Sequence, residues 1–236
     1  MDKHSYAMPE EAVITHLNWQ ANVNFEEKVI NAVAIFDIEK TPEADKIVLD
    51  ALQLNIIDVA DGEGQTLEFN LGEEQEFLGQ PLQIQLRRDT RQIRVRYSTS
   101  PNAEALQWLS PVQTSGGELP FLFTQSQAIL ARSWIPIQDS PGIRFTYAAD
   151  VQVPENMLAL MSASNPTKKS HDGRYHFDMK QPIPAYLMAL AVGDIVYEKL
   201  TDRTGVYAEP NVIKAAAFEF EEMDAMVNAA EELYGP

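Results

Sequence analysis

The chain of 236 residues contains no cysteine. A disulfide framework, a thiolate nucleophile and a thiolate metal site are therefore excluded, and the redox compartment stays open. Basic residues are scarce, since 18 Lys plus Arg stand against 35 Asp plus Glu, which gives a net charge of −17. This charge opposes binding to polyanions, so we expect neither nucleic acid nor a membrane as a partner. It favours solubility, and it could also attract cationic groups such as free amino termini.

Long apolar runs are also missing. No stretch reaches the roughly 18 apolar residues of a membrane-spanning helix. The start of the chain, MDKHSYAMPEE, lacks the apolar region of a signal peptide. We therefore expect a cytoplasmic protein, and the alternative is a periplasmic or secreted protein whose leader has been removed.

Motifs for catalysis and metal binding are absent as well. The sequence has no G-x-S-x-G turn, no P-loop and no G-x-G-x-x-G after a strand. His171 and His176 lie five apart in SHDGRYHF, whereas a helical zinc pair lies at i and i+4, so we interpret both as solvated loop histidines. The acidic cluster GEEQE at 72–76 is typical of a solvated turn. The residues by themselves predict no catalytic centre and no metal site.

Strand patterns fill most of the chain. Between Thr15 and Phe25 apolar and polar residues alternate strictly, which predicts a half-buried strand, and residues 29–38 predict its partner. Similar alternation follows in TLEFNLG, PLQIQLR and QIRVRYST, and later in residues 143–154, in MLALMSAS and in AYLMALAVGDIVYEKL. Short strands separated by turn residues predict a mainly β fold rich in antiparallel pairs.

The composition changes after Gly205. Pro210 suits a first helical position, and apolar residues then recur at spacings of three and four up to Leu233. We predict one amphipathic helix over 210–234, with an acidic outer face. Because its apolar stripe ends where the chain ends, we expect a second domain to follow, and we expect the isolated chain to form a nonnative oligomer through this helix.

One apolar stretch contains two glutamines at alternate positions. Residues 121–141 read FLFTQSQAILARSWIPIQDSP, and continued strand geometry would place Gln125 and Gln127 on the same face as Phe121 and Phe123. The amides could bond to loop backbone inside the domain, which the residues alone favour because buried amides usually find internal partners. They could also present hydrogen-bonding groups to a ligand.

Three segments resemble a known family. They are FLFTQSQAILARSWIPIQDSPGIRFTYAADVQVPENMLALMSA, QPIPAYLMALAVGDI at 181–195 and RTGVYAEPNVIKAAAFEFEEMDAMVNAAEELYGP. In this order the motifs Gln-x-Gln-Ala, Pro-x-x-Asp-x-Pro and Pro-x-Pro-x-Tyr-Leu resemble the amino-terminal domain of zinc aminopeptidases of the aminopeptidase N and leukotriene hydrolase family. The resemblance is strongest to the leukotriene hydrolase branch.

The resemblance implies a fold and a site. Residues 1–203 would form a saddle-like β-sandwich domain of mixed curved sheets, and 204–236 would begin a thermolysin-like α domain. The glutamine at the position of Gln127 would reach the active-site cleft and bind the substrate's amino-terminal residue, with Gln125 and Ala128 beside it. Asp139, in Asp-Ser-Pro, would be the acceptor of a structural turn.

The chain also departs from the family pattern. The exopeptidase motif Gly-x-Met-Glu-Asn, the H-E-x-x-H helix and its downstream glutamate ligand do not occur in it. In the family these would supply the zinc site, the general base and the carboxylate that grips the substrate's free amino terminus. We therefore expect an amino-terminal fragment of a zinc aminopeptidase that acts on peptides. The full-length parent would bind the zinc ion. This part would form a wall of the substrate cleft and would neither bind zinc nor hydrolyse peptides. The alternative is a stand-alone β-sandwich module that binds carbohydrate or protein.

Overall fold

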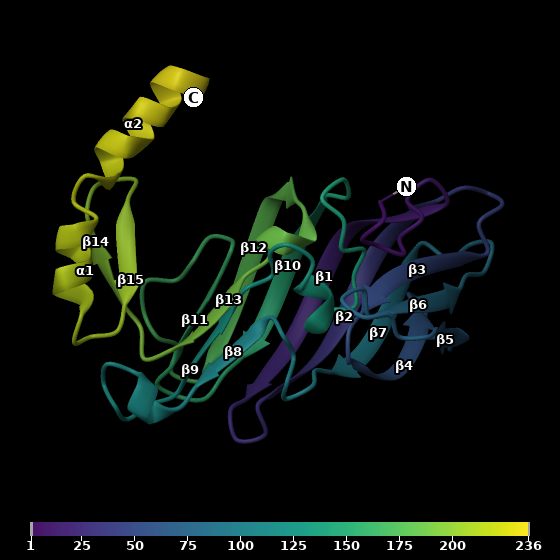
Figure 1. The fold of residues 1–236 in the computed structure, drawn as a ribbon, viewed down its shortest axis with the longest axis horizontal. Helices are drawn as coiled ribbons and strands as arrows, with labels where there is room; N and C mark the ends of the chain where they lie inside the picture. The colour runs from purple at the N-terminus through teal and green to yellow at the C-terminus, as the bar shows by residue number, and fades with distance from the viewer. Residues whose placement is uncertain (1, 236) are drawn as a thin grey trace.

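A six-stranded sheet forms the framework of the protein. The computed structural model describes residues 2–235, and the strands of this sheet lie in the order β12-β10-β1-β2-β7-β4 (Figure 1). Their bounds are β1 (Ala12–Asn24), β2 (Val29–Lys40), β4 (Asn55–Asp61), β7 (Gln92–Ser98), β10 (Phe145–Gln152) and β12 (Arg174–Ile183). β1 and β10 run parallel, and the other neighbours are antiparallel. The sheet is therefore mixed.

Two smaller antiparallel sheets share one hydrophobic core with the large sheet. The first contains β3 (Lys46–Ala51), β6 (Gln80–Gln85) and β5 (Phe69–Leu71), and the second contains β11 (Leu158–Met161), β13 (Leu190–Gly193), β9 (Phe121–Thr124) and β8 (Leu106–Leu109). This core includes Trp19 and Phe36 of the large sheet, Leu49 of the first small sheet and Leu122 of the second. The mainly β fold predicted from the sequence is confirmed.

The alternation in the first strand determines which face of the large sheet is covered. Leu17, Trp19 and Val23 of β1 are buried in the core, whereas Gln20 and Asn22 between them are exposed. Since successive side chains of a strand point to opposite faces, the apolar set faces the small sheets and the polar set faces outward. The predicted partner strand over 29–38 is β2, and the predicted strand over 143–154 is β10.

The chain ends in a separate small unit. The hairpin of β14 (Val196–Lys199) and β15 (Gly205–Ala208) is followed by α1 (Ile213–Glu219) and α2 (Met223–Tyr234). Val206, Ile213 and Ala217 form its own apolar cluster. The predicted domain boundary at 203/204 falls in the turn of this hairpin and stays a prediction. No helix in residues 2–235 is long and apolar enough to cross a membrane.

The predicted helical segment forms two helices rather than one. Residues 210–212 are a turn, and residues 220–222 form a second turn between α1 and α2. The reason is that the two halves are held by different contacts. α1 packs its apolar face on the hairpin, whereas α2 buries no residue and extends away from the sheets (Figure 1).

Arg203 holds α2 against the hairpin turn. Its Nε donates to Asp224 Oδ1 at 2.9 Å and its Nη1 donates to Glu231 Oε1 at 3.0 Å. Asp224 and Glu231 lie seven residues apart, two turns along one face of α2. These hydrogen bonds raise the pKa of Arg203 and lower the pKa of Asp224. The contact is therefore ionic, and salt weakens such exposed contacts.

Replacing Arg203 should release α2 alone. In Arg203→Ala we expect faster amide hydrogen exchange throughout Met223–Tyr234, because the two carboxylates lose their donor, and unchanged exchange in β1. Lys199→Ala, which removes a hairpin ammonium bound to Asp202, is the control and should leave α2 exchange unchanged. If the amide hydrogens of α2 exchange at the same rate in the wild type, Arg203→Ala and Lys199→Ala, Arg203 does not hold the helix.

Candidate functional site

The glutamine pair lies in a turn after β9. β9 ends at Thr124, so the expectation that strand geometry continues through Gln125 and Gln127 is wrong. Gln125 N still donates to Ala105 O at 2.9 Å, but Leu130 N then donates to Ser126 O at 2.8 Å and closes a turn. A 3-10 helix, η2 (Ala131–Ser133), follows directly. The peptide bond between Gln127 and Ala128 is cis.

The three predicted substrate-binding residues are exposed. Gln125, Gln127 and Ala128 all present their side chains to solvent, whereas Ser126 between the glutamines is only 3% exposed. Neither glutamine carboxamide is hydrogen-bonded to any residue in 2–235. The internal role that the residues alone favoured is therefore not found, and both amides keep free donors and acceptors.

Ser126 anchors this turn to the core. Its Oγ accepts a hydrogen bond from Trp134 Nε1 at 3.0 Å and donates one to Met188 O at 3.2 Å. Trp134 O in turn accepts from the Tyr97 hydroxyl at 2.9 Å, and that hydroxyl accepts from Trp19 Nε1 at 2.9 Å. Burial raises the pKa of Tyr97, so its hydroxyl stays protonated and can donate. A continuous hydrogen-bonded line thus runs from β1 to the turn.

The same line is reinforced by aromatic packing. The rings of Trp19 and Trp134 meet edge to face with centroids 5.3 Å apart, and both side chains are fully buried. An edge-to-face pair of this kind adds about 0.5–1.5 kcal/mol to the stabilisation from burial. The turn that carries Gln127 is therefore attached to a rigid part of the core.

A buried ion cluster fixes the other end of the loop. Arg132 is fully buried, and its backbone N and its Nε both donate to Asp139 Oδ2 at 3.2 Å. Its two remaining nitrogens donate to Leu78 O at 2.8 Å and to His4 O at 2.7 Å. Asp139 is therefore an acceptor, but its donors belong to Arg132 and not to the Asp-Ser-Pro turn in which it was predicted to act.

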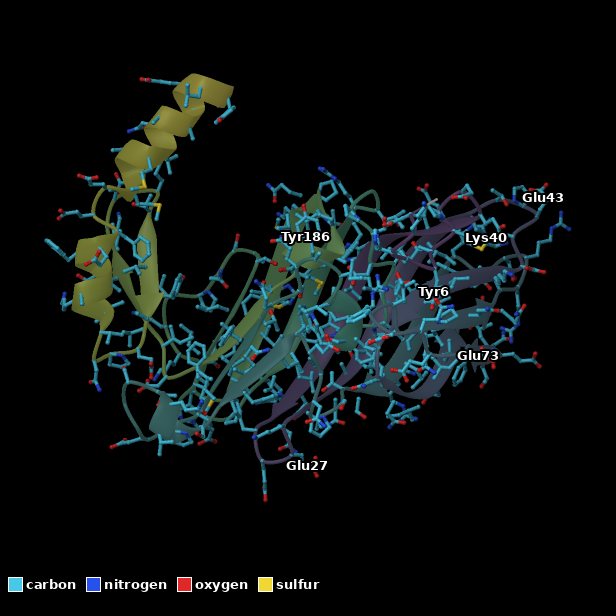
Figure 2. All side chains as sticks on the ribbon, viewed as in Figure 1. Tyr6, Glu27, Lys40, Glu43, Glu73 and Tyr186 are labelled. Carbon is cyan, nitrogen blue, oxygen red and sulfur yellow. The ribbon has the colours of Figure 1, made fainter. Side chains whose placement is uncertain are left out.

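Asp50 connects this cluster to the start of the chain. Its carboxylate accepts from Ser5 Oγ at 2.6 Å, from Tyr6 N at 2.7 Å and from Asp139 N at 2.9 Å. Figure 2 shows Tyr6 beside the three-stranded sheet, where its hydroxyl donates to Gly79 O. The first residues are therefore tied to the base of the glutamine loop.

The buried amide of this stretch belongs to Gln138. Its Oε1 accepts from Ile14 N at 3.0 Å and its Nε2 donates to Ala12 O at 2.9 Å, and the residue is fully buried. Sequence reasoning missed Ser126, Arg132 and Gln138. One signal was available, because an arginine inside the apolar run ILARSWIPI must be paired if it is buried.

The histidines do not form a metal site. His16 Nδ1 contacts Thr146 Oγ1 at 2.7 Å, and His176 Nδ1 contacts Asp150 Oδ1 at 2.8 Å on the exposed face of the large sheet. His171 lies in a loop as predicted, whereas His176 lies in β12 and not in a loop. Within residues 2–235 no group of three or more His, Asp or Glu is placed to hold a metal ion.

The fold agrees with comparisons to known proteins. The family described as Peptidase M1 N-terminal domain matches residues 13–187, and the chain belongs to this family of zinc metallopeptidases. The chain is 36% identical to leukotriene A-4 hydrolase of Xenopus laevis over its whole length, which is 40% of that protein. It is 38% identical to leucine aminopeptidase 2 of Yarrowia lipolytica, with 84% of the chain and 31% of that protein covered.

Solved structures agree with these relatives. Yeast LTA4 hydrolase in complex with bestatin superposes with a TM-score of 0.91 at 29% identity, over 98% of this chain and 37% of that one. An M1 zinc metallopeptidase of Deinococcus radiodurans superposes with a TM-score of 0.62 at 19% identity, over 84% of this chain and 46% of that one, which shows a shared fold. The chain thus spans less than half of each of these proteins.

Removing the Ser126 hydroxyl should destabilise the protein. In Ser126→Ala the buried indole N–H of Trp134 loses its acceptor, and we expect a loss of about 1–3 kcal/mol in the free energy of unfolding, measured by urea denaturation. Ser115→Ala, at an exposed serine, is the matched control and should change it by less than about 0.5 kcal/mol. Equal effects of the two substitutions would contradict the anchoring role.

Asp139 should make stability depend on pH. Burial raises the pKa of Asp139 to about 6, against the opposing attraction of Arg132. A folded-state pKa above the unfolded value means that protonation favours the folded state, so this contribution is lost as pH rises through about 6. Between pH 7 and pH 5 we expect the wild type to gain about 1 kcal/mol more in unfolding free energy than Asp139→Asn.

The control for this pH effect is Asp89→Asn, at an exposed carboxylate. It should keep the pH dependence of the wild type, whether measured by urea or by thermal unfolding. A pH dependence of Asp139→Asn that equals that of the control would rule out titration of Asp139 in this range.

Proposed function

We propose that the chain forms one wall of the substrate cleft of an M1 zinc aminopeptidase that removes amino-terminal residues from peptides. The observation that supports this role is the exposed carboxamide of Gln127 on a turn anchored through Ser126. The family membership of the chain provides the reaction class. The relatives' names, which include leucine aminopeptidase, point to the same chemistry.

An amide suits the recognition of a peptide's polar end. The Gln127 carboxamide can donate to a carbonyl and accept from an ammonium without adding a charge to the site. In this proposal Gln125 and Ala128 line the same surface. The net charge of −17 raises the local concentration of ligands with a free, cationic amino terminus.

The bond-breaking chemistry belongs to residues outside 2–235. A zinc ion bound in a companion domain would supply the Lewis acid, and the described residues would orient the substrate only. We propose that α2 meets this companion domain through its exposed apolar side chains, which include Met226 and Leu233. In the chain by itself, the same stripe would pair with a second copy.

A chimera tests the role of Gln127. The chain would replace the matching 40% of the Xenopus relative, and hydrolysis of an aminoacyl amide would be measured. We expect Gln127→Ala to lower kcat/KM by about 3- to 30-fold, because loss of one or two substrate hydrogen bonds costs about 0.5–2 kcal/mol. Gln85→Ala, at an exposed glutamine of β6, should leave kcat/KM unchanged.

The chimera and its Gln85→Ala variant distinguish a wrong role for Gln127 from a wrong role for the whole chain. An active chimera in which Gln127→Ala matches Gln85→Ala would remove Gln127 from the substrate site. An inactive chimera with bound zinc would argue against the cleft-wall role itself. In that case, a reading frame without H-E-x-x-H beyond residue 236 would favour the stand-alone binding module instead.

A further inference from the structure

The outward face of the large sheet carries rows of polar side chains. Asn22 of β1 pairs in register with Gln152 of β10 and with Asn31 of β2. The register extends this row over all six strands, in the order Arg174, Gln152, Asn22, Asn31, Ser98, Asn55. Since neighbouring strands lie about 4.8 Å apart, the row spans roughly 24 Å across the sheet.

The centre of this row has free hydrogen-bonding capacity. The outer members are occupied, because Arg174 Nε donates to Gln152 Oε1 at 3.1 Å and Asn55 Nδ2 donates to Ser98 Oγ at 3.3 Å. Asn22 and Asn31 are exposed, and so is Gln20 in the next row. The carboxamides of these three residues form no hydrogen bond to any residue of the described chain.

This surface is hollowed. Gln20, Asn22, Asn31 and Gln152 line a depression of about 690 Å³, within the usual range of about 300–1,000 Å³ for ligand sites. Val33 and Ile57 also line it, and Ile57 is 49% exposed. The depression therefore combines uncharged amides with apolar patches.

The charged groups around the depression are of both signs. Arg96 forms an ion pair with Asp58 of the adjacent strand, and His176 Nδ1 lies 2.8 Å from Asp150 Oδ1. Arg174 Nε lies 3.9 Å from Asp172 Oδ2 and also donates to Gln152 Oε1. With two arginines beside three aspartates, the depression has no large excess of either sign and favours an uncharged ligand over a phosphate or a carboxylate.

We infer that this depression binds a neutral oligosaccharide lying across the strands. Sugar rings present hydroxyl groups at their edges and apolar C–H groups on their faces, which match the free amides and the Val33 and Ile57 patches. A row of amides that crosses the sheet suits an extended chain of several sugar units. This binding site is independent of the glutamine turn and of the proposed peptidase reaction.

The position of the depression argues against a peptide. A peptide gains most from the unpaired backbone groups of a sheet edge, and Gln20, Asn22 and Asn31 lie on β1 and β2, whose backbones are paired on both sides. Nucleic acid is disfavoured because the chain carries a net charge of −17.

Calorimetry and NMR on the full chain test this inference. The probes are neutral hexasaccharides of glucose, xylose, mannose and N-acetylglucosamine. We expect at least one to bind with a Kd between about 10 μM and 1 mM and to shift the side-chain amide signals of Asn22 and Asn31. The triple variant Gln20→Ala, Asn22→Ala, Asn31→Ala should weaken this binding at least about tenfold, because it removes the free amides.

Asn18→Ala is the matched control, since Asn18 is an exposed amide of β1 outside the depression. It should bind the hexasaccharide as the wild type does. Asn22→Asp, which adds only a charge, should also weaken binding and is used if the triple variant does not fold. Three results would overturn the inference: no hexasaccharide binds at about 5 mM, the triple variant binds equally well, or a neutral Gly-Ser peptide shifts the same amides while the sugars do not.

Discussion

The hydroxyl of Ser126 determines how the glutamine turn is held. It accepts from the Trp134 indole and donates to Met188 O, and through Trp134 and Tyr97 it is connected to Trp19 in the middle of β1. Each of these donors is buried, so each bond is costly to break. The backbone that carries Gln125 and Gln127 is therefore held in place, although their exposed amides have no partner in the described chain.

A second buried cluster supports the same loop from its other end. Arg132 binds Asp139 directly, and Asp50 binds Asp139 N together with Ser5 and Tyr6. A fully buried guanidinium is tolerated only when its donors are satisfied, and here three backbone carbonyls and a carboxylate satisfy them. The stretch from 126 to 139 is thus anchored to the core at both ends.

The large sheet uses its two faces for different purposes. One face packs Trp19, Phe36 and Tyr97 into the core shared with both small sheets. The other face carries amides and paired charges over a shallow depression. The alternation of side chains in β1 and β2 produces both faces at once, because side chains two residues apart point the same way. Rows that cross the strands arise only after the strands pair.

The strands were predictable because a half-buried strand alternates apolar and polar residues along the sequence. β1, β2 and β10 lie where this pattern placed them. Alternation gave the wrong structure at Gln125 and Gln127, because two residues spaced by two can lie in a turn as well as in a strand. Here the hydrogen bond from Leu130 N to Ser126 O closes a turn. The spacing of apolar residues also did not predict that the helical segment divides into α1 and α2. It does not show that α1 packs on the hairpin while α2 buries no residue.

By itself, the sequence determined the strand content, the charge and the absence of a zinc-binding motif in the chain, since these depend on local periodicity and composition. Only the tertiary structure decided which amides are buried and which are free. Gln138 fills the donor and acceptor needs of β1, whereas Gln127 stays exposed. The reason is that burial of a polar side chain depends on partners distant in sequence, here Ile14 and Ala12, which only folding brings within hydrogen-bond reach.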